Sequence, residues 1–277
     1  MTTAAPERAP EGAGSPADDR VVGLSRTADG RPVPSASRRA RRRGRVEDPF
    51  VGWVAAVSVG LLALFLRLWK LGTPHEFLFD ETYYAEDAWS LLHFGAEQEY
   101  RQGADARILA GDLEQWTGNP AYVVHPPGGK WMIAAGEAVF GFDPTGWRVA
   151  VAVLGTLSVL VVARIARRMF GSTVLGCVAG LLLALDGLHF VSSRTALLDL
   201  ILMFWALLAF GCLVLDRDAT RSRLASWRAR RRVPLEGYGP ALGLRPWRLA
   251  AGVCLGLACA TKWSGLWFVV AFGLLSY

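Results

Sequence analysis

Long apolar segments recur along the chain and constrain its fold more than any other feature. They cover residues 50–69, 147–163, 173–191, 196–215 and 248–263, and a sixth opens at Gly265 and runs to residue 277. Each complete segment reaches, or nearly reaches, the length with which a helix spans the roughly 30 Å hydrocarbon core of a bilayer. With 52% hydrophobic residues, the chain is too apolar for an ordinary soluble domain. The predicted fold class is an all-α polytopic membrane protein.

The residues before the first apolar segment indicate how the chain enters the membrane. Residues 1–48 are rich in Pro, Gly, Ser, Ala and charge, and an arginine-rich stretch covers residues 38–45. We expect a disordered cytoplasmic tail, because such a composition cannot form a core and because Lys and Arg flank membrane segments on the cytoplasmic side. A cleaved signal would have its apolar core nearer the start, so the segment that begins near Phe50 should stay in the membrane.

Threading the chain from this tail gives each loop a side. Loop 71–146 lies outside, and the arginine-rich loop 216–247 lies inside, as the positive-inside tendency requires. The net charge of +6 therefore reflects orientation in a plasma membrane and not a nucleic-acid partner. Residues 49–277 form the membrane domain in this threading. Because the chain stops within its sixth apolar segment, we expect a piece of a longer protein.

The outer loop 71–146 differs in kind from the other loops because it is long and acidic. It can carry short surface helices near residues 83–94 and 130–140. The four cysteines lie inside apolar segments without metal-type spacing, and we interpret them as small core residues. They are Cys177, Cys212, Cys254 and Cys259.

Asp80 and Glu81 are adjacent carboxylates just beyond the first apolar segment. They can be solvated acids that complement the dipole at a helix N-terminus. Alternatively, one of them accepts a proton from an attacking hydroxyl, as a half-buried carboxylate does when its pKa is tuned. Consecutive residues point in different directions, so the second carboxylate would position a substrate or a divalent cation, which makes such a cation a candidate cofactor.

The stretch from His125 to Lys130, with the sequence HPPGGK, lies directly before the predicted helix near 130–140. Its prolines fix the backbone, and its glycines permit close approach of a ligand or of another backbone. It can be a helix-entry loop with a polar rim, or a place where His125 and Lys130 contact a substrate.

Three charged residues interrupt the later apolar segments. Asp186 within an apolar helix would be costly without a partner, and Arg194 is the near candidate for a structural ion pair. In the functional interpretation, Arg194 holds a phosphate with its guanidinium. Lys262 can extend to the surface beside Trp263, but a lysine on the outer side suggests an anionic partner.

Four motifs, taken in order, carry a family resemblance. They are Phe79–Glu81 (FDE), His125–Lys130 (HPPGGK) with Gly141–Pro144 (GFDP) downstream, Ser193–Asp199 (SRTALLD) and Thr261–Gly265 (TKWSG). Together they resemble the protein O-mannosyltransferases, and most closely the actinobacterial enzymes that use polyprenyl-phosphate mannose. One departure is Gly128, where many members carry a bulkier residue.

The resemblance implies a GT-C glycosyltransferase fold with its active site between the first outer loop and the bilayer. It implies transfer of mannose from a polyprenyl-phosphate donor to Ser or Thr hydroxyls of exported proteins, with the export machinery as a candidate partner. Asp80 carries over as the presumed base and Glu81 as a second catalytic acid. The remaining matches are expected to bind substrate, and Arg194 and Lys262 to contact the lipid phosphate. They are His125, Lys130, Arg194, Asp199 and Lys262.

Two other functions fit parts of the pattern. A transferase of the same fold could use a glycolipid or a cell-wall glycan as its acceptor, since these motifs specify the acceptor poorly. A transporter could use Asp186, Asp199 and Lys262 as an ion path. Transporters favour midplane sites and repeated halves, whereas these polar groups gather at one face.

Overall fold

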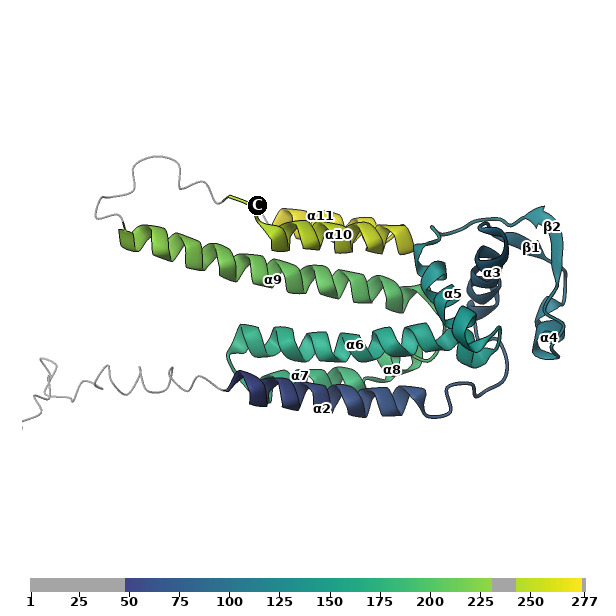
Figure 1. Cartoon of the computed structure of the whole chain (residues 1–277), viewed down its shortest axis with the longest axis horizontal. Coiled ribbons are helices and arrows are strands. Elements are labelled where there is room, and N and C mark those ends of the chain that lie inside the picture. The colour runs from purple at the N-terminus through teal and green to yellow at the C-terminus, as the bar shows by residue number, and fades with distance from the viewer. Residues whose placement is uncertain (1–47, 231–242, 276–277) are drawn as a thin grey trace, which may run out of the picture. The chain divides into compact units, whose positions relative to one another are not determined.

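The computed structural model of the protein describes residues 48–230 and 243–275. Residues 1–47 of the predicted tail, part of the arginine-rich loop 216–247 and the last two residues lie outside this range. The longest helices are α2 (Pro49–Leu68), α6 (Pro144–Phe170) and α9 (Leu198–Arg230), and shorter apolar helices lie beside them (Figure 1). The shorter ones are α7 (Thr173–Leu185), α8 (Gly187–Ser192), α10 (Pro246–Thr261) and α11 (Gly265–Leu275).

By length and composition, α2, α6 and α9 are able to cross a membrane, and α7, α10 and α11 are apolar but shorter. Short polar residues and prolines define where the long helices begin. Asp48 accepts a hydrogen bond from the N–H of Phe50 at 2.9 Å, directly before Pro49. Asp143 does the same for α6, accepting from the N–H groups of Thr145 and Gly146. Such caps satisfy amide groups that have no partner within the helix.

The predicted segment 173–191 is not one helix. Asp186 has an extended backbone that ends α7, and its carboxylate accepts the N–H of His189 at 2.8 Å to begin α8. The expectation of an aspartate buried within a continuous apolar helix is therefore wrong. Aspartate favours the N-cap because its side chain replaces a missing backbone partner, and here that preference breaks the segment in two.

Loop 71–146 is more structured than the sequence indicates. It contains helices α3 (Glu81–Phe94), α4 (Ala104–Leu109) and α5 (Gly128–Phe140). It also contains strands β1 (Gln98–Tyr100) and β2 (Trp116–Pro120), which pair antiparallel around α4. The fold class is confirmed as mainly helical, and this small sheet is an addition that the sequence analysis did not predict.

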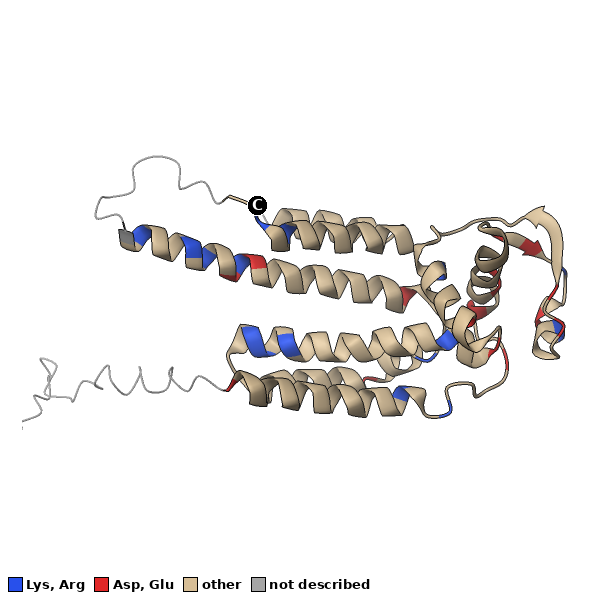
Figure 2. Ribbon diagram, viewed as in Figure 1, with Lys and Arg blue, Asp and Glu red and all other residues tan. Residues whose placement is uncertain are grey.

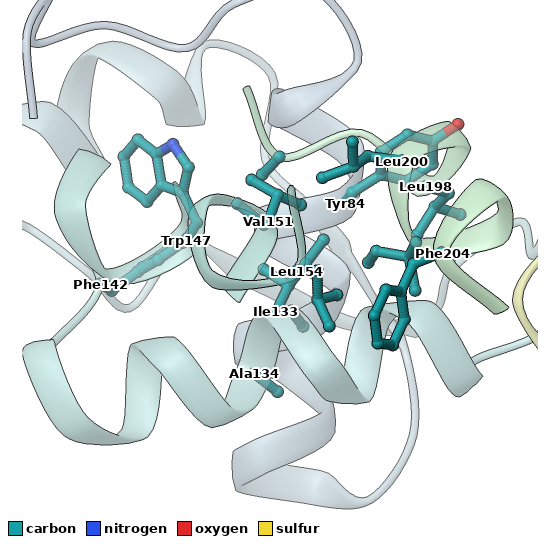
Figure 3. Packing of buried hydrophobic residues seen from close by; sticks show 14 of the residues in the cluster. Tyr84, Ile133, Ala134, Phe142, Trp147, Val151, Leu154, Leu198, Leu200 and Phe204 are labelled. Carbon is teal, nitrogen blue, oxygen red and sulfur yellow. The ribbon is translucent and has the colours of Figure 1, made fainter. Parts of the chain in front are cut away.

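A hydrophobic core joins the loop elements to the long helices. Figure 3 shows part of this cluster, which contains Ile133 from α5, Trp147 from α6, and Leu198 and Phe204 from α9. The ring of Phe77 stacks on fully buried Trp147 with centroids 4.5 Å apart. Since this core contains residues of α3, α5, α6 and α9, the loop is fixed to the helices rather than tethered beside them.

The Lys and Arg residues of α6 and α9 gather toward one end of these helices, with buried Arg148 as the exception. Figure 2 shows Lys and Arg at the ends of α6 and α9 that lie away from the loop elements. Acidic residues are frequent on the loop elements at the other end. This polarity matches the distribution that the positive-inside tendency produces in membrane proteins.

Candidate active site

Asp80 stands at the start of α3 and lines a cavity of about 770 Å³. The preceding residue, Phe79, has a φ of 59°, a left-handed conformation that is uncommon for a bulky residue, and it is exposed. Strained backbone of this kind persists where the surroundings hold it, often beside functional groups. Here the turn leaves the Asp80 carboxyl half-buried at the cavity wall.

Tyr84 lies one turn along α3 from Asp80, and its hydroxyl reaches the Asp80 carboxylate at 3.5 Å. Burial, and next the charge of Asp80, raises the pKa of Tyr84 to about 12. The phenol therefore stays protonated at neutral pH and can donate a hydrogen bond to the carboxylate or to a bound hydroxyl.

Glu81 has a different environment from its neighbour, because it is fully buried. Arg148 on α6 binds it with two nitrogens, Nε to Oε1 at 2.8 Å and Nη2 to Oε2 at 2.7 Å. The backbone N–H groups of Leu78 and Ala196 donate to the same carboxylate at 2.9 and 2.8 Å. The interpretation of Glu81 as a solvated acid is wrong, since both oxygens are engaged by protein groups, and its contact with substrate or a cation stays a prediction.

Arg148 also binds the chain that connects α2 to α3. Its guanidinium donates to the carbonyl groups of Leu71, Pro74 and Glu76 at 3.3, 2.9 and 2.7 Å. One buried side chain therefore fixes both the connecting segment and the first turn of α3, and through them the position of Asp80.

His125 lines the same cavity as Asp80 and is half-buried. Burial lowers its pKa, and the positive charges of Lys262 and Lys130 lower it further. The ring is therefore neutral at pH 7, and its buried Nδ1 has no hydrogen-bond partner among the described residues. A neutral imidazole beside the carboxylate can accept or donate one hydrogen bond to a sugar hydroxyl.

Lys130 is buried in the first turn of α5, where two carboxylates neutralise it. Its Nζ lies 2.9 Å from Asp87 Oδ2 and 2.8 Å from Glu97 Oε1. It borders the cavity, yet its charge is already matched. In the structure Lys130 joins α3, α5 and the strand region, and its contact with substrate stays a prediction.

The two glycines before Lys130 permit close approach of other parts of the protein. A Cβ at Gly128 would lie 2.7 Å from the carbonyl oxygen of Ala260 on α10. A Cβ at Gly129 would lie 2.7 Å from atoms of Leu198 and Thr261. The glycines thus bring α5 against α10, and this contact places His125 near the end of α10.

Lys262 and Asp199 form an ion pair between the end of α10 and the start of α9. Lys262 Nζ lies 2.8 Å from Asp199 Oδ1, and the side chains are 22% and 62% exposed. Both charges affect the pKa of His125, as does that of Asp80, so Asp80, Asp199 and Lys262 each lie within electrostatic reach of His125. The structure thus brings Asp80, His125, Asp199 and Lys262 together.

Arg194 does not join this group through any contact among the described residues. Its Nη1 donates to the carbonyl groups of Leu66, Arg67 and Trp69 at 3.0, 2.9 and 2.7 Å, and its Nη2 to that of Lys70 at 3.0 Å. These carbonyls lie at or just beyond the end of α2, where helix carbonyls lack partners. The expected ion pair between Arg194 and Asp186 is wrong, and Arg194 lines a separate cavity from Asp80.

Residues missed by the sequence analysis hold much of the site. Arg148 stands within the predicted segment 147–163, and an arginine in an apolar segment demands a buried partner, so a signal for it existed. Tyr84 had no such signal, because only the helix brings it to Asp80. Among residues 48–230 and 243–275, no group of three or more His, Cys, Asp and Glu side chains is placed to hold a metal ion.

The chain matches known membrane glycosyltransferases. Residues 124–228 match the model of the dolichyl-phosphate-mannose-protein mannosyltransferase family, whose members have the GT-C membrane fold. Together with the three apolar helices that are long enough to span a bilayer, this match identifies a membrane protein with a glycosyltransferase domain.

Alignments with individual relatives, each longer than this chain, narrow the family further. A polyprenol-phosphate-mannose–protein mannosyltransferase of Mycolicibacterium smegmatis is 45% identical over 234 residues, which are 83% of this chain and 42% of the relative. The enzyme of the same name from Mycobacterium tuberculosis is 43% identical over 237 residues, 83% of this chain and 41% of the relative. That from Corynebacterium glutamicum is 39% identical over 207 residues, 74% and 37%. The chain is homologous to these mannosyltransferases and spans less than half of their length, and the predicted resemblance is confirmed.

Proposed function

We propose that the protein transfers mannose from polyprenyl-phosphate mannose to Ser or Thr hydroxyls of exported proteins. The observation that carries this proposal is the position of Asp80, half-buried on a large cavity and within electrostatic reach of His125, which Lys262 also influences. The names of the relatives supply the donor and the protein acceptor.

In the proposed reaction, the acceptor hydroxyl oxygen attacks the anomeric carbon of mannose while the bond from that carbon to the phosphate oxygen breaks. Asp80 takes the hydroxyl proton, and the polyprenyl phosphate leaves with the bonding electrons. A positioned base contributes about 10²–10⁴-fold to a rate, and charges placed where negative charge develops contribute comparably or more.

Lys262 is the cation that we assign to the departing phosphate. The Lys262 side chain is partly exposed, and its partner Asp199 is more exposed still, so a phosphate can approach the ammonium. We do not keep Arg194 as a phosphate contact in this proposal, because four carbonyl groups engage its guanidinium and it lines another cavity.

The site is proposed to face the outside of the plasma membrane in a multi-pass arrangement with a cytoplasmic N-terminus. The concentration of Lys and Arg at the opposite ends of α6 and α9 supports this orientation (Figure 2). A membrane-impermeant thiol reagent should label a cysteine introduced at exposed Tyr122 in intact cells. Protection of that cysteine until the cells are opened would overturn the orientation and the exported acceptor with it.

Asp80→Asn tests the base directly. In membranes containing the full-length protein, labelled polyprenyl-phosphate mannose and a Ser/Thr peptide, we expect transfer to fall at least about 100-fold. Asp112→Asn is the matched control, since Asp112 is an exposed carboxylate of the same loop that does not line the cavity. Retention of most of the rate by Asp80→Asn would exclude Asp80 as the base.

The same assay also tests whether the acceptor is a protein, if the labelled product is identified. If label enters a membrane glycolipid or a glycan and no peptide, the alternative transferase with a non-protein acceptor replaces this proposal. Label in the peptide, at a Ser or Thr located by mass spectrometry, supports it.

A further inference from the structure

The cavity beside Asp80 is acidic well beyond the catalytic carboxylate. Five carboxyl groups line it, whereas only two of its lining residues are Lys or Arg. One of these, Arg101, is exposed, and the other, Lys130, is already neutralised by Asp87 and Glu97. The volume of about 770 Å³ is typical of sites that enclose a ligand larger than one sugar ring. Such a cavity repels an anionic lipid phosphate and attracts a cationic group.

Two of these carboxyl groups, from Glu86 and Asp105, meet without a basic partner. Glu86 is only 8% exposed and borders the cavity, and its Oε1 has no hydrogen-bond partner among the described residues. Asp105 accepts the Thr82 hydroxyl at 2.6 Å, and no Lys or Arg in the described ranges forms a salt bridge with either carboxyl.

The two carboxyl groups share a proton. Burial, and next the charges of Asp105 and Asp87 and a side-chain hydrogen bond with Asp105, raise the pKa of Glu86 to about 8, so Glu86 is protonated at neutral pH. A cationic side chain that approaches both groups would favour release of this proton and bind the two carboxylates. We take the ligand to be an organic cation, because a Lys or Arg side chain carries several N–H donors and can hydrogen-bond both carboxyl groups.

We propose that Glu86 and Asp105 form a subsite for a Lys or Arg side chain of the acceptor polypeptide. The inference rests on the proposed function and adds a charge preference to it. The donor is excluded from this subsite by charge, since its phosphate belongs on the side of Lys262. Exposed Tyr122 and Val124 line the same cavity and offer apolar surface to a bound polypeptide.

The helix geometry predicts where the basic residue stands in the acceptor. Asp80 and Glu86 are six positions apart on α3, which corresponds to about 9 Å along the helix axis. An extended polypeptide advances about 3.3 Å per residue, so the basic residue should lie about two to four positions from the modified Ser or Thr.

The test compares three peptides that each contain one Thr and carry Lys, Gln or Glu three positions away. With the full-length protein in liposomes, we expect kcat/KM for the Lys peptide to exceed that for the Gln peptide by roughly tenfold, and the Glu peptide to be poorest. Asp105→Asn should remove the advantage of Lys, and Asp105→Arg should give the advantage to Glu. The control Asp112→Asn should keep the wild-type order.

Equal use of the three peptides by the wild-type protein would overturn the subsite while leaving mannose transfer intact. A rise in the KM for the donor in Asp105→Asn, with the Lys preference unchanged, would assign these carboxyls to the sugar and also overturn it. If no peptide is mannosylated, the proposed function fails, and fluorescence anisotropy of labelled peptides then decides the subsite. Tighter binding of the Lys peptide that disappears in Asp105→Asn supports it, and equal binding of the three peptides refutes it.

Discussion

Arg148 and Glu81 form a buried, two-point ion pair, with Nε to Oε1 at 2.8 Å and Nη2 to Oε2 at 2.7 Å. The pair connects α6 to the first turn of α3, and the same guanidinium binds the segment that leads to Asp80. The residue next to the proposed base is therefore part of the support of the site and does not face the cavity.

Removing one partner of this pair should destabilise the protein. Glu81→Gln leaves Arg148 buried without its counter-charge, and breaking a buried pair costs about 3–5 kcal/mol. We expect a lower midpoint of thermal unfolding in detergent, together with loss of transfer. Arg148→Lys should behave similarly, because one ammonium cannot reproduce the two-point contact. A fully stable Glu81→Gln protein that has lost only activity would return Glu81 to a catalytic role.

Lys262→Gln should reduce activity and leave the stability of the protein nearly unchanged, unlike Glu81→Gln. The ion pair with Asp199 is substantially exposed, and such pairs contribute less than about 1 kcal/mol to folding. We expect nearly unchanged thermal unfolding and a fall in transfer of roughly 100-fold, from loss of charge at the departing phosphate. Asp199→Asn is the matched control, since it breaks the same pair but keeps the cation and should lose less activity. Equal losses in the two variants would argue against a phosphate contact.

Arg194→Lys tests whether this arginine supports the fold. Lysine cannot satisfy the four carbonyl groups at the end of α2, so we expect a loss of about 1–3 kcal/mol in stability. The KM for the lipid donor should change little, as measured in membranes at a temperature where the variant is folded. An increased KM with normal unfolding would instead show that Arg194 binds the donor.

Glu137 predicts a pH dependence of stability. This α5 residue is 1% exposed, neither carboxyl oxygen has a hydrogen-bond partner among the described residues, and burial raises its pKa well above the ordinary range. The folded protein keeps it protonated while the unfolded chain ionises it. The folded state is therefore favoured below the ordinary pKa and loses stability as pH rises toward the raised pKa, by at most about 1.4 kcal/mol per pH unit.

Thermal unfolding of Glu137→Gln at pH 5 and pH 8 measures this contribution. We expect the difference between the two pH values to be smaller than in the wild-type protein, although the contribution of Glu86 remains because its pKa is raised for a similar reason. Identical pH dependence in both proteins would show that Glu137 is not the buried acid described here.

The apolar segments were predictable because membrane helices must satisfy their own backbone and bury a continuous apolar length. The first residues of helices α2, α6 and α9 lie within three positions of the first residues of the predicted segments, whereas the break at Asp186 was not predicted. The helix breaks there because the Asp186 side chain caps the next helix, and a hydropathy profile does not detect such a cap.

The candidate site was also predicted only in part from the sequence. Sequence motifs identified Asp80, Asp199 and Lys262, which the structure brings within electrostatic reach of His125, itself part of a motif. They also selected Glu81, Lys130 and Arg194, which the structure shows bound to protein groups. Residue type and spacing cannot separate these cases, because a buried arginine or carboxylate has the same sequence signature whether it binds the substrate or supports the fold.

By itself, the sequence determined that this protein is a bundle of apolar helices with an acidic loop after the first of them and several charged motifs. Those properties follow from hydropathy and local residue chemistry, which act over a few turns of chain. Only the tertiary structure decided that Arg148 satisfies Glu81 across 67 positions of sequence and that Glu86 meets Asp105, with no salt bridge to a Lys or Arg among the described residues. Which charge is neutralised depends on what packs beside it, and packing is a property of the folded chain.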